Sequence, residues 1–147
     1  MAHEFIQHLK KDHEKQRKLG KGLAEATDPE QRERMRRQMY EEVFPHMIGE
    51  EASIFPFMQD SGDEEARDGA MEAVQEHHVG KIILRELMNL SLESDVFKAK
   101  AKVLDELNRH HMDEEEKEHF PWLERNCSTD QLEELFDRYE RAEEKEP

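Results

Sequence analysis

Two related segments of the chain, HMIGEEASIFP at residues 46–56 and HMDEEEKEHFP at residues 111–121, decide which fold the sequence can adopt. Each segment has a glutamate four residues after its histidine and a Phe-Pro pair that begins nine residues after it. Residues i and i+4 lie on one face of an α-helix, so each His-Glu pair can bind the same ion. The two segments are 65 residues apart, and the same separation pairs His13 with His78. This repeat indicates two helical hairpins built on a common pattern.

Four breaks divide the chain into helices. Residues typical of turns and caps interrupt the helical periodicity at residues 27–30, 60–63, 91–95 and 126–129. Between the breaks, apolar residues recur at helical intervals. In the third helix the expected core residues are Met71, Val74, Ile82, Leu84, Leu87 and Leu90. We therefore predict an all-α protein, in which residues 1–126 form an up-down-up-down antiparallel four-helix bundle and residues 127–147 form a short C-terminal helix with an acidic tail.

Composition and charge exclude several classes of protein. The chain has 147 residues, which suits one domain, and its 40% charged residues with few Gly and Pro favour long amphipathic helices. A net charge of −15 argues against binding to nucleic acid or to an anionic membrane. The sequence shows neither a membrane-spanning run nor a signal peptide, and its single cysteine, Cys127, excludes an intramolecular disulfide and a cysteine-based metal cluster. We expect a cytoplasmic protein and leave its oligomeric state open.

The spacing of four histidines brings them to one level of the predicted bundle. In a helical hairpin, residues equally far from the turn lie at the same height. The midpoints between successive members of the series His13, His46, His78 and His111 are 29.5, 62 and 94.5, and each falls in a predicted break. Each histidine is therefore about 24 Å along its helix from a turn, at a rise of about 1.5 Å per residue.

Together with the two glutamates, these histidines form a predicted ligand set. Its six members are His13, His46, Glu50, His78, His111 and Glu115. Six ligands are too many for one tetrahedral zinc ion, and the set contains no thiolate. Four imidazoles and two carboxylates suit two first-row metal ions, each held by two imidazoles and sharing two bridging carboxylates.

The other histidines and the neighbouring glutamates are assigned different positions. The 65-residue offset matches His77 and His110 to non-histidine residues, so both are expected to point away from the site. For His8 and His119, a role beside the ligands or as a spare ligand stays open, whereas His3 is expected at the surface. The residues that follow the ligand glutamates, Glu51 and Glu116, are expected either at the helix surface or in hydrogen bonds to ligand imidazoles.

The pattern of histidines and His-Glu pairs resembles the hemerythrin, or HHE cation-binding, domain over roughly residues 3–125. The resemblance implies a non-haem, oxo-bridged di-iron centre in a four-helix bundle. It makes the four histidines terminal ligands, with His13 and His46 mainly on one iron, and makes Glu50 and Glu115 the bridges. Oxygen-carrying members have a fifth histidine one turn before the third-helix ligand, where this chain has Val74.

The predicted function is to bind or react with a small oxidant: dioxygen, hydrogen peroxide or nitric oxide. The alternative is a non-enzymatic carrier, buffer or sensor of oxygen or iron, and a third interpretation is a metal-free helical interaction domain. The sequence assigns no general acid or base, so an enzymatic activity stays open. Two iron ions are the predicted cofactor, with manganese and zinc as alternatives that share these ligands.

Overall fold

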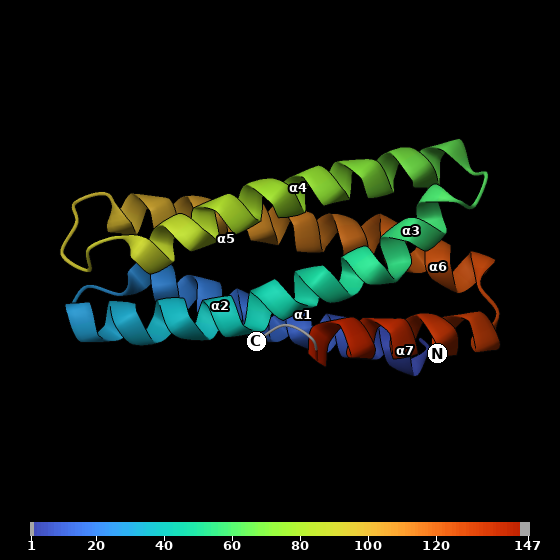
Figure 1. Cartoon of the computed structure of the whole chain (residues 1–147), viewed down its shortest axis with the longest axis horizontal. Coiled ribbons are helices and arrows are strands. Elements are labelled where there is room, and N and C mark those ends of the chain that lie inside the picture. The colour runs from blue at the N-terminus through green and yellow to red at the C-terminus, as the bar shows by residue number, and fades with distance from the viewer. Residues whose placement is uncertain (1, 145–147) are drawn as a thin grey trace.

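The computed structural model describes residues 2–144, and this part of the chain contains helices and no strand (Figure 1). Four long helices lie side by side: α1 (Glu4–Glu25), α2 (Pro29–Ala52), α4 (Glu64–Asn89) and α5 (Phe97–Glu114). The shorter elements are α3 (Ile54–Gln59), the π-helix η1 (Glu115–His119), α6 (Phe120–Asn126) and α7 (Thr129–Glu144). The prediction of an all-α protein is confirmed. The end of the predicted acidic tail, residues 145–147, lies outside the described residues.

At three of the predicted breaks, a side chain caps the start of the next helix. The carboxylate of Asp28 accepts a hydrogen bond from the backbone N–H of Gln31 (2.9 Å), directly before Pro29 opens α2. In the same way Asp63 caps the start of α4, and the hydroxyl of Ser128 accepts from the first turn of α7. Each of these side chains satisfies backbone donors that a helix start leaves free, so the chain restarts a helix at these points.

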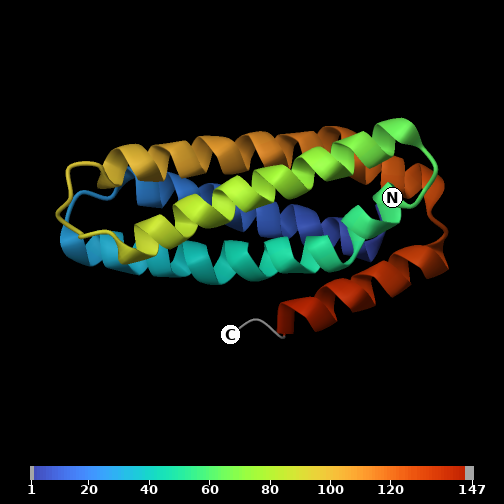
Figure 2. The same ribbon diagram turned by 45° about the horizontal axis from the view of Figure 1, so that its top comes forward.

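The long helices pack as a bundle. α1 contacts α2 and α5, and α4 also contacts α2 and α5. Successive long helices are joined at alternate ends of the molecule (Figures 1 and 2). α7 lies outside these four helices and packs on α2 and, to a smaller extent, on α1.

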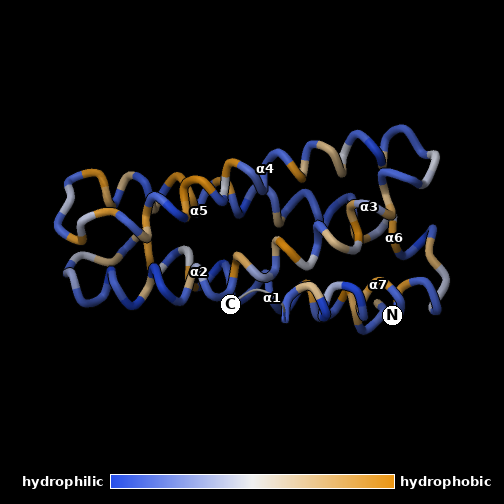
Figure 3. Tube along the Cα trace, in the orientation of Figure 1, coloured by the Kyte–Doolittle hydropathy of each residue, from blue (hydrophilic) through white to orange (hydrophobic). Residues whose placement is uncertain are grey.

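The interior contains two apolar clusters separated by a polar layer. One cluster, around Phe5, Phe55 and Phe120, lies at the end where α3, α6 and α7 meet. The other, around Leu23 and Leu104, lies toward the connections between α1 and α2 and between α4 and α5. Figure 3 shows the hydrophobic positions spaced along each helix among hydrophilic ones. Buried His, Glu, Gln and Asn side chains lie between the two clusters, so the bundle has a polar centre between two apolar ends.

The core face of α4 differs from the predicted one. Met71 and Ile82, expected in the core, are 47% and 44% exposed. The buried face instead repeats at intervals of four and three and uses mainly small residues: Ala66, Ala70, Ala73, His77, Gly80, Leu84 and Leu87. Small side chains let α4 approach its neighbours closely, and the large apolar residues on its outer face gave a misleading periodicity.

Within residues 2–144, every helix is too short or too polar to cross a membrane.

Candidate metal centre

Five of the six predicted ligands meet in the polar centre of the bundle. All five side chains are buried. They come from four elements: His13 from α1, His46 and Glu50 from α2, His111 from α5, and Glu115 from the first position of η1.

The fourth imidazole comes from His77, and the prediction that His78 fills this position is wrong. His77 is 1% exposed, whereas His78 is exposed to solvent. The 65-residue offset assumed hairpins of equal length, but His77 and His111 are 34 residues apart and His13 and His46 only 33. The connection between α4 and α5 is the longer one. Successive helical residues differ by about 100° in direction, so a shift of one residue turns His78 outward.

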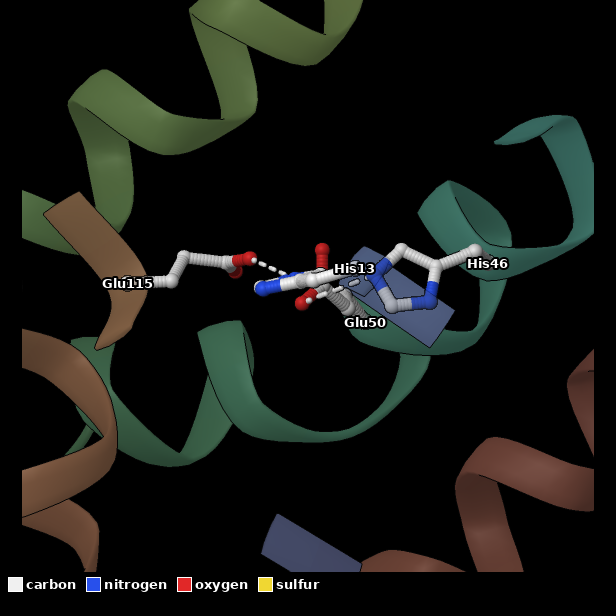
Figure 4. A group of neighbouring side chains, drawn as sticks. All are labelled: His13, His46, Glu50 and Glu115. Atoms are coloured by element: carbon white, nitrogen blue, oxygen red, sulfur yellow. Dashed lines mark ion pairs between the residues drawn. The ribbon is translucent and has the colours of Figure 1, made fainter. Parts of the chain in front are cut away.

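The donor atoms form two groups that share one carboxylate. In each group, all donor atoms lie within 4.8 Å of one another. The first group, drawn in Figure 4, is His13, His46, Glu50 and Glu115. The second is Glu50, His77 and His111. Two imidazoles per group agree with the division of the histidines expected from the sequence, once His77 replaces His78.

Glu50 extends one carboxylate oxygen toward each group. Its Oε2 atom lies 3.4 Å from Nε2 of His46, which belongs to the first group. Its Oε1 atom lies 3.2 Å from Nε2 of His77, which belongs to the second. This is the arrangement required of a carboxylate that bridges two ions.

Glu115 belongs to the first group alone, but it also extends one oxygen toward a histidine of the second. Its Oε1 atom lies 3.1 Å from Nε2 of His13, and its Oε2 atom lies 3.5 Å from Nε2 of His111. Both glutamates therefore link the two pairs of imidazoles.

Several of these atoms lack a hydrogen bond. The Nε2 atoms of His13 and His46 and all four carboxylate oxygens of Glu50 and Glu115 are buried without a hydrogen-bond partner, although the ion pairs above bring some of them close together. An unpartnered buried polar atom costs about 1–3 kcal/mol. Six such atoms pointing at one another are explained if cations lie between them.

The separation of His77 and His111 also fits a cation. Their Nε2 atoms are 2.9 Å apart. Two nitrogens bound about 2.1 Å from one ion and at right angles to each other are about 3 Å apart. Imidazoles with carboxylates and no thiolate suit iron or manganese, so the residues present fit a pair of first-row ions.

A carboxylate holds the other nitrogen of every imidazole. Each Nδ1 atom lies within hydrogen-bond distance of an Asp or Glu oxygen, which fixes the ring and leaves Nε2 directed at the centre. The pairs are His13–Glu116 (2.6 Å), His46–Asp12 (3.0 Å), His77–Glu51 (2.8 Å) and His111–Glu76 (2.8 Å).

These four carboxylates follow the pseudo-symmetry of the chain. Asp12 and Glu76 directly precede His13 and His77, and Glu51 and Glu116 directly follow the two ligand glutamates. For Glu51 and Glu116 the sequence left two possibilities open, and the structure shows the hydrogen bond to a ligand imidazole. Asp12 and Glu76 were not predicted. An acidic residue beside a histidine on the buried face of a helix is the signal that identifies them.

The charges of the centre stabilise one another. Burial opposes the charged form of His46, but Glu50 and Asp12 raise the pKa of this imidazole well above its usual value. Likewise, burial opposes the charged form of His111, and Glu115 is the strongest of the carboxylates that raise its pKa. Burial also disfavours the Glu50 carboxylate, yet His46 and the other imidazoles hold the pKa of Glu50 well below its usual value. A bound cation would take the place of these protons, so metal binding would release them.

Aromatic rings close the centre at the end defined by the Phe-Pro pairs. Phe120 stacks on His13 with ring centroids 5.5 Å apart, and Phe55 lies 5.1 Å from the His77 ring. The chain becomes irregular at or near both ligand glutamates: α2 ends at Ala52, two residues after Glu50, and α5 passes into the π-helix η1 at Glu115. Such irregular turns are frequent at functional sites.

The opposite side of the centre has a small cavity. Its volume is about 10 Å³, close to the minimum for one water molecule. Its walls include His77 and His111, together with Met47, Gly80 and Asn108. Asn108 donates a hydrogen bond to the buried Gln16 (3.0 Å). This space beside the second group is about the size of one water molecule.

The remaining histidines lie outside the two groups. Nδ1 of His3 caps the start of α1 by accepting from the N–H of Phe5. His8 is 3.5 Å from Asp12, and His110 is an exposed neighbour of Glu76. His119 is buried on η1 with its Nδ1 unpartnered, and it is absent from both ligand groups.

Comparison with known proteins gives one family and one relative. The family model described as hemerythrin HHE cation binding domain matches residues 4–123. An uncharacterized hemerythrin-like protein of Schizosaccharomyces pombe is 26% identical over 132 residues, which cover 90% of this chain and 65% of the relative. The chain thus spans less than two thirds of the length of that protein. No solved structure matches the chain.

Proposed function

Because the chain belongs to the hemerythrin HHE cation-binding family, we propose that it is a non-haem di-iron protein that binds or reacts with a small oxidant. The centre lies inside an up-down-up-down four-helix bundle. The observation that carries this proposal is the pair of buried glutamates, each with one oxygen toward either pair of imidazoles.

Each iron has its own pair of imidazoles in this proposal. His13 and His46 would hold one ion, His77 and His111 would hold the other, and the two glutamates would bridge them. The lack of hydrogen-bond partners on the glutamate oxygens supports this assignment, because within the described chain these buried oxygens meet only the ligand imidazoles.

When bound, two irons sharing carboxylate bridges supply electrons to dioxygen or peroxide, or bind nitric oxide. The residues around them select the size of the ligand and exclude water. Phe55 and Phe120 cover one side. On the other side, the small cavity beside His77 and His111 favours ligands of few atoms.

The first experiment is to measure the metal content of the protein, element by element, after aerobic purification without an affinity tag. Two irons per chain support the proposal, and two manganese ions support the site with a different metal. A folded protein that holds no metal, even after incubation with Fe²⁺ under anaerobic conditions, contradicts it and favours the helical interaction domain.

A second experiment separates a carrier from an enzyme. The reduced, iron-loaded protein is mixed with dioxygen and its visible spectrum is followed. An adduct that disappears on removal of dioxygen shows a carrier. Rapid irreversible oxidation, or consumption of added hydrogen peroxide over many turnovers, shows redox chemistry. Absence of any reaction with dioxygen, peroxide and nitric oxide contradicts the proposed function while leaving the metal site intact.

A further inference from the structure

α7 brings a tyrosine to one edge of the metal centre. Tyr139 is fully buried, and its hydroxyl donates a hydrogen bond to Oδ2 of Asp12 (2.9 Å). The same hydroxyl oxygen lies 2.8 Å from Nδ1 of His46. When Nε2 of His46 binds a metal ion, the Nδ1–H group faces two acceptors, the Asp12 carboxylate and the Tyr139 oxygen. α7 lies beyond residues 4–123, which the family model matches.

A glycine in the ligand motif admits this tyrosine. A Cβ atom at Gly49 would lie 2.6 Å from Cδ2 and Cε2 of the Tyr139 ring, closer than any real contact. Gly49 directly precedes the bridging Glu50. The glycine therefore lets α7 approach α2 at the level of the ligands, where the ring also contacts Phe5.

Within residues 2–144, no tyrosine hydroxyl reaches an imidazole of the second group. Glu114 stands where Gly49 stands in the first hairpin, 65 residues later. It lies 3.4 Å from His110, whose side chain is 61% exposed. The imidazole of His111 has a single Nδ1 partner, Glu76. The two pairs of imidazoles are alike, but their surroundings are not.

We propose that Tyr139 is a positioning residue that fixes His46 through the shared Asp12 carboxylate and makes the His13–His46 position the tighter of the two metal positions. The inference rests on the proposed function, in that both positions hold metal. The His46 imidazole, held by oxygens of Asp12 and Tyr139, has less conformational freedom to lose when it binds an ion. The position at His77 and His111, which adjoins the cavity, is then the one left for the small ligand.

The test is a calorimetric titration of the metal-free full chain with Co²⁺. The wild type is expected to bind two ions in two resolved steps. Tyr139→Phe keeps the ring against Gly49 and removes only the hydroxyl, so we expect the tighter step to weaken about tenfold. The weaker step is expected to stay unchanged. The matched control is Tyr40→Phe, because Tyr40 is the only other tyrosine and stacks on Phe44 away from the ligands.

Two further variants keep the test decisive if Tyr139→Phe does not fold. Asp12→Asn is expected to weaken the same step as Tyr139→Phe. Glu76→Gln makes the corresponding change beside His111 and is expected to weaken the other step. In the Co²⁺ form we also expect faster solvent exchange of one shifted imidazole N–H resonance in Tyr139→Phe, a signature that a purely structural role does not produce.

The outcomes separate this inference from the proposed function. Two binding steps that are the same in Tyr139→Phe and wild type overturn the inference. So does a result in which Asp12→Asn and Glu76→Gln weaken the same step. A wild-type chain that binds no Co²⁺ instead contradicts the proposed function.

Discussion

His77 Nε2 lies 2.9 Å from His111 Nε2 in the interior of the bundle, while His78, the next residue of α4, is exposed. The two neighbouring histidines thus provide a matched pair of substitutions in one helix turn. His77→Leu is expected to lose half or more of the bound iron, because the second position keeps only one imidazole. His78→Leu is expected to keep the wild-type iron content.

Iron content is measured by elemental analysis on both variants, after circular dichroism has shown that each is helical. Equal iron in His77→Leu and wild type would remove His77 from the ligand set. Iron lost from His78→Leu alone would restore the assignment made from the sequence.

Glu51 is expected to act on the metal only through His77. Its Oε2 atom lies 2.8 Å from Nδ1 of His77, and its other oxygen pairs with Lys81 at the same distance. Removing this acceptor in Glu51→Ala frees the ring and is expected to weaken metal binding about 10- to 100-fold. The measurement is competition of the loaded protein with a chelator of known affinity.

The control for Glu51→Ala is Glu86→Ala, which also removes a glutamate from an ion pair with a lysine, here Lys100. An exposed pair of this kind is worth about 0–1 kcal/mol of stability and is remote from the ligands. Equal loss of metal affinity in both variants would show a general effect of charge and contradict the specific role of Glu51.

Most of the bundle and five of the six predicted ligands could be placed from the sequence, because both depend on short-range spacing. A His-Glu pair four residues apart lies on one helix face whatever the rest of the chain does. Breaks such as Asp28-Pro29 mark helix ends through local capping chemistry. These features need no knowledge of tertiary packing.

The wrong predictions concern residues whose relative positions depend on the length of the connection between two helices. An offset of 65 residues relates His46 to His111 and therefore predicts His78 as the partner of His13. The second hairpin is longer by one residue, so the buried histidine is His77. The buried face of α4 consists mainly of Ala and Gly, which are weakly hydrophobic. The hydrophobic pattern of this helix therefore does not indicate that His77, and not His78, faces the interior. Tyr139 meets Asp12 across 127 residues of sequence, and no local pattern predicts that contact.

Cys127, the single thiol of the chain, is expected to report on the docking of α7. It lies between α6 and α7 and packs partly against the apolar cluster that contains Tyr139. Burial raises the pKa of the Cys127 thiol to about 11, from a usual value of 9.0. Since only the thiolate reacts, alkylation by iodoacetamide is expected to accelerate about tenfold per pH unit up to pH ~10, without a plateau near 9.

The control for this prediction is the same reaction in concentrated urea, where the thiol is free and the rate is expected to level off near its usual pKa. A plateau near pH 9 in the folded protein would mean that the junction between α6 and α7 is open in solution. That result would also weaken the case for Tyr139 as a constant neighbour of His46.

Gly80 is expected to control the size of the ligand cavity. A Cβ atom at this position would meet the methyl group of Met47 at 3.0 Å, and both residues line the cavity beside His77 and His111. Gly80→Ala therefore pushes a flexible side chain toward the cavity beside the second group, while alanine favours the helix by about 1 kcal/mol. Gly22→Ala is the matched control, because its Cβ meets the methyl group of Met35, and neither residue lines the cavity. Both variants are expected to fold and to bind iron, but only Gly80→Ala is expected to bind nitric oxide more weakly or more slowly. Stopped-flow absorbance of the iron-loaded proteins measures this difference. Equal ligand binding by Gly80→Ala and Gly22→Ala would show that small molecules reach the irons by another route. The reason is that the cavity has no room for a ligand once the methyl group of Met47 has moved into it.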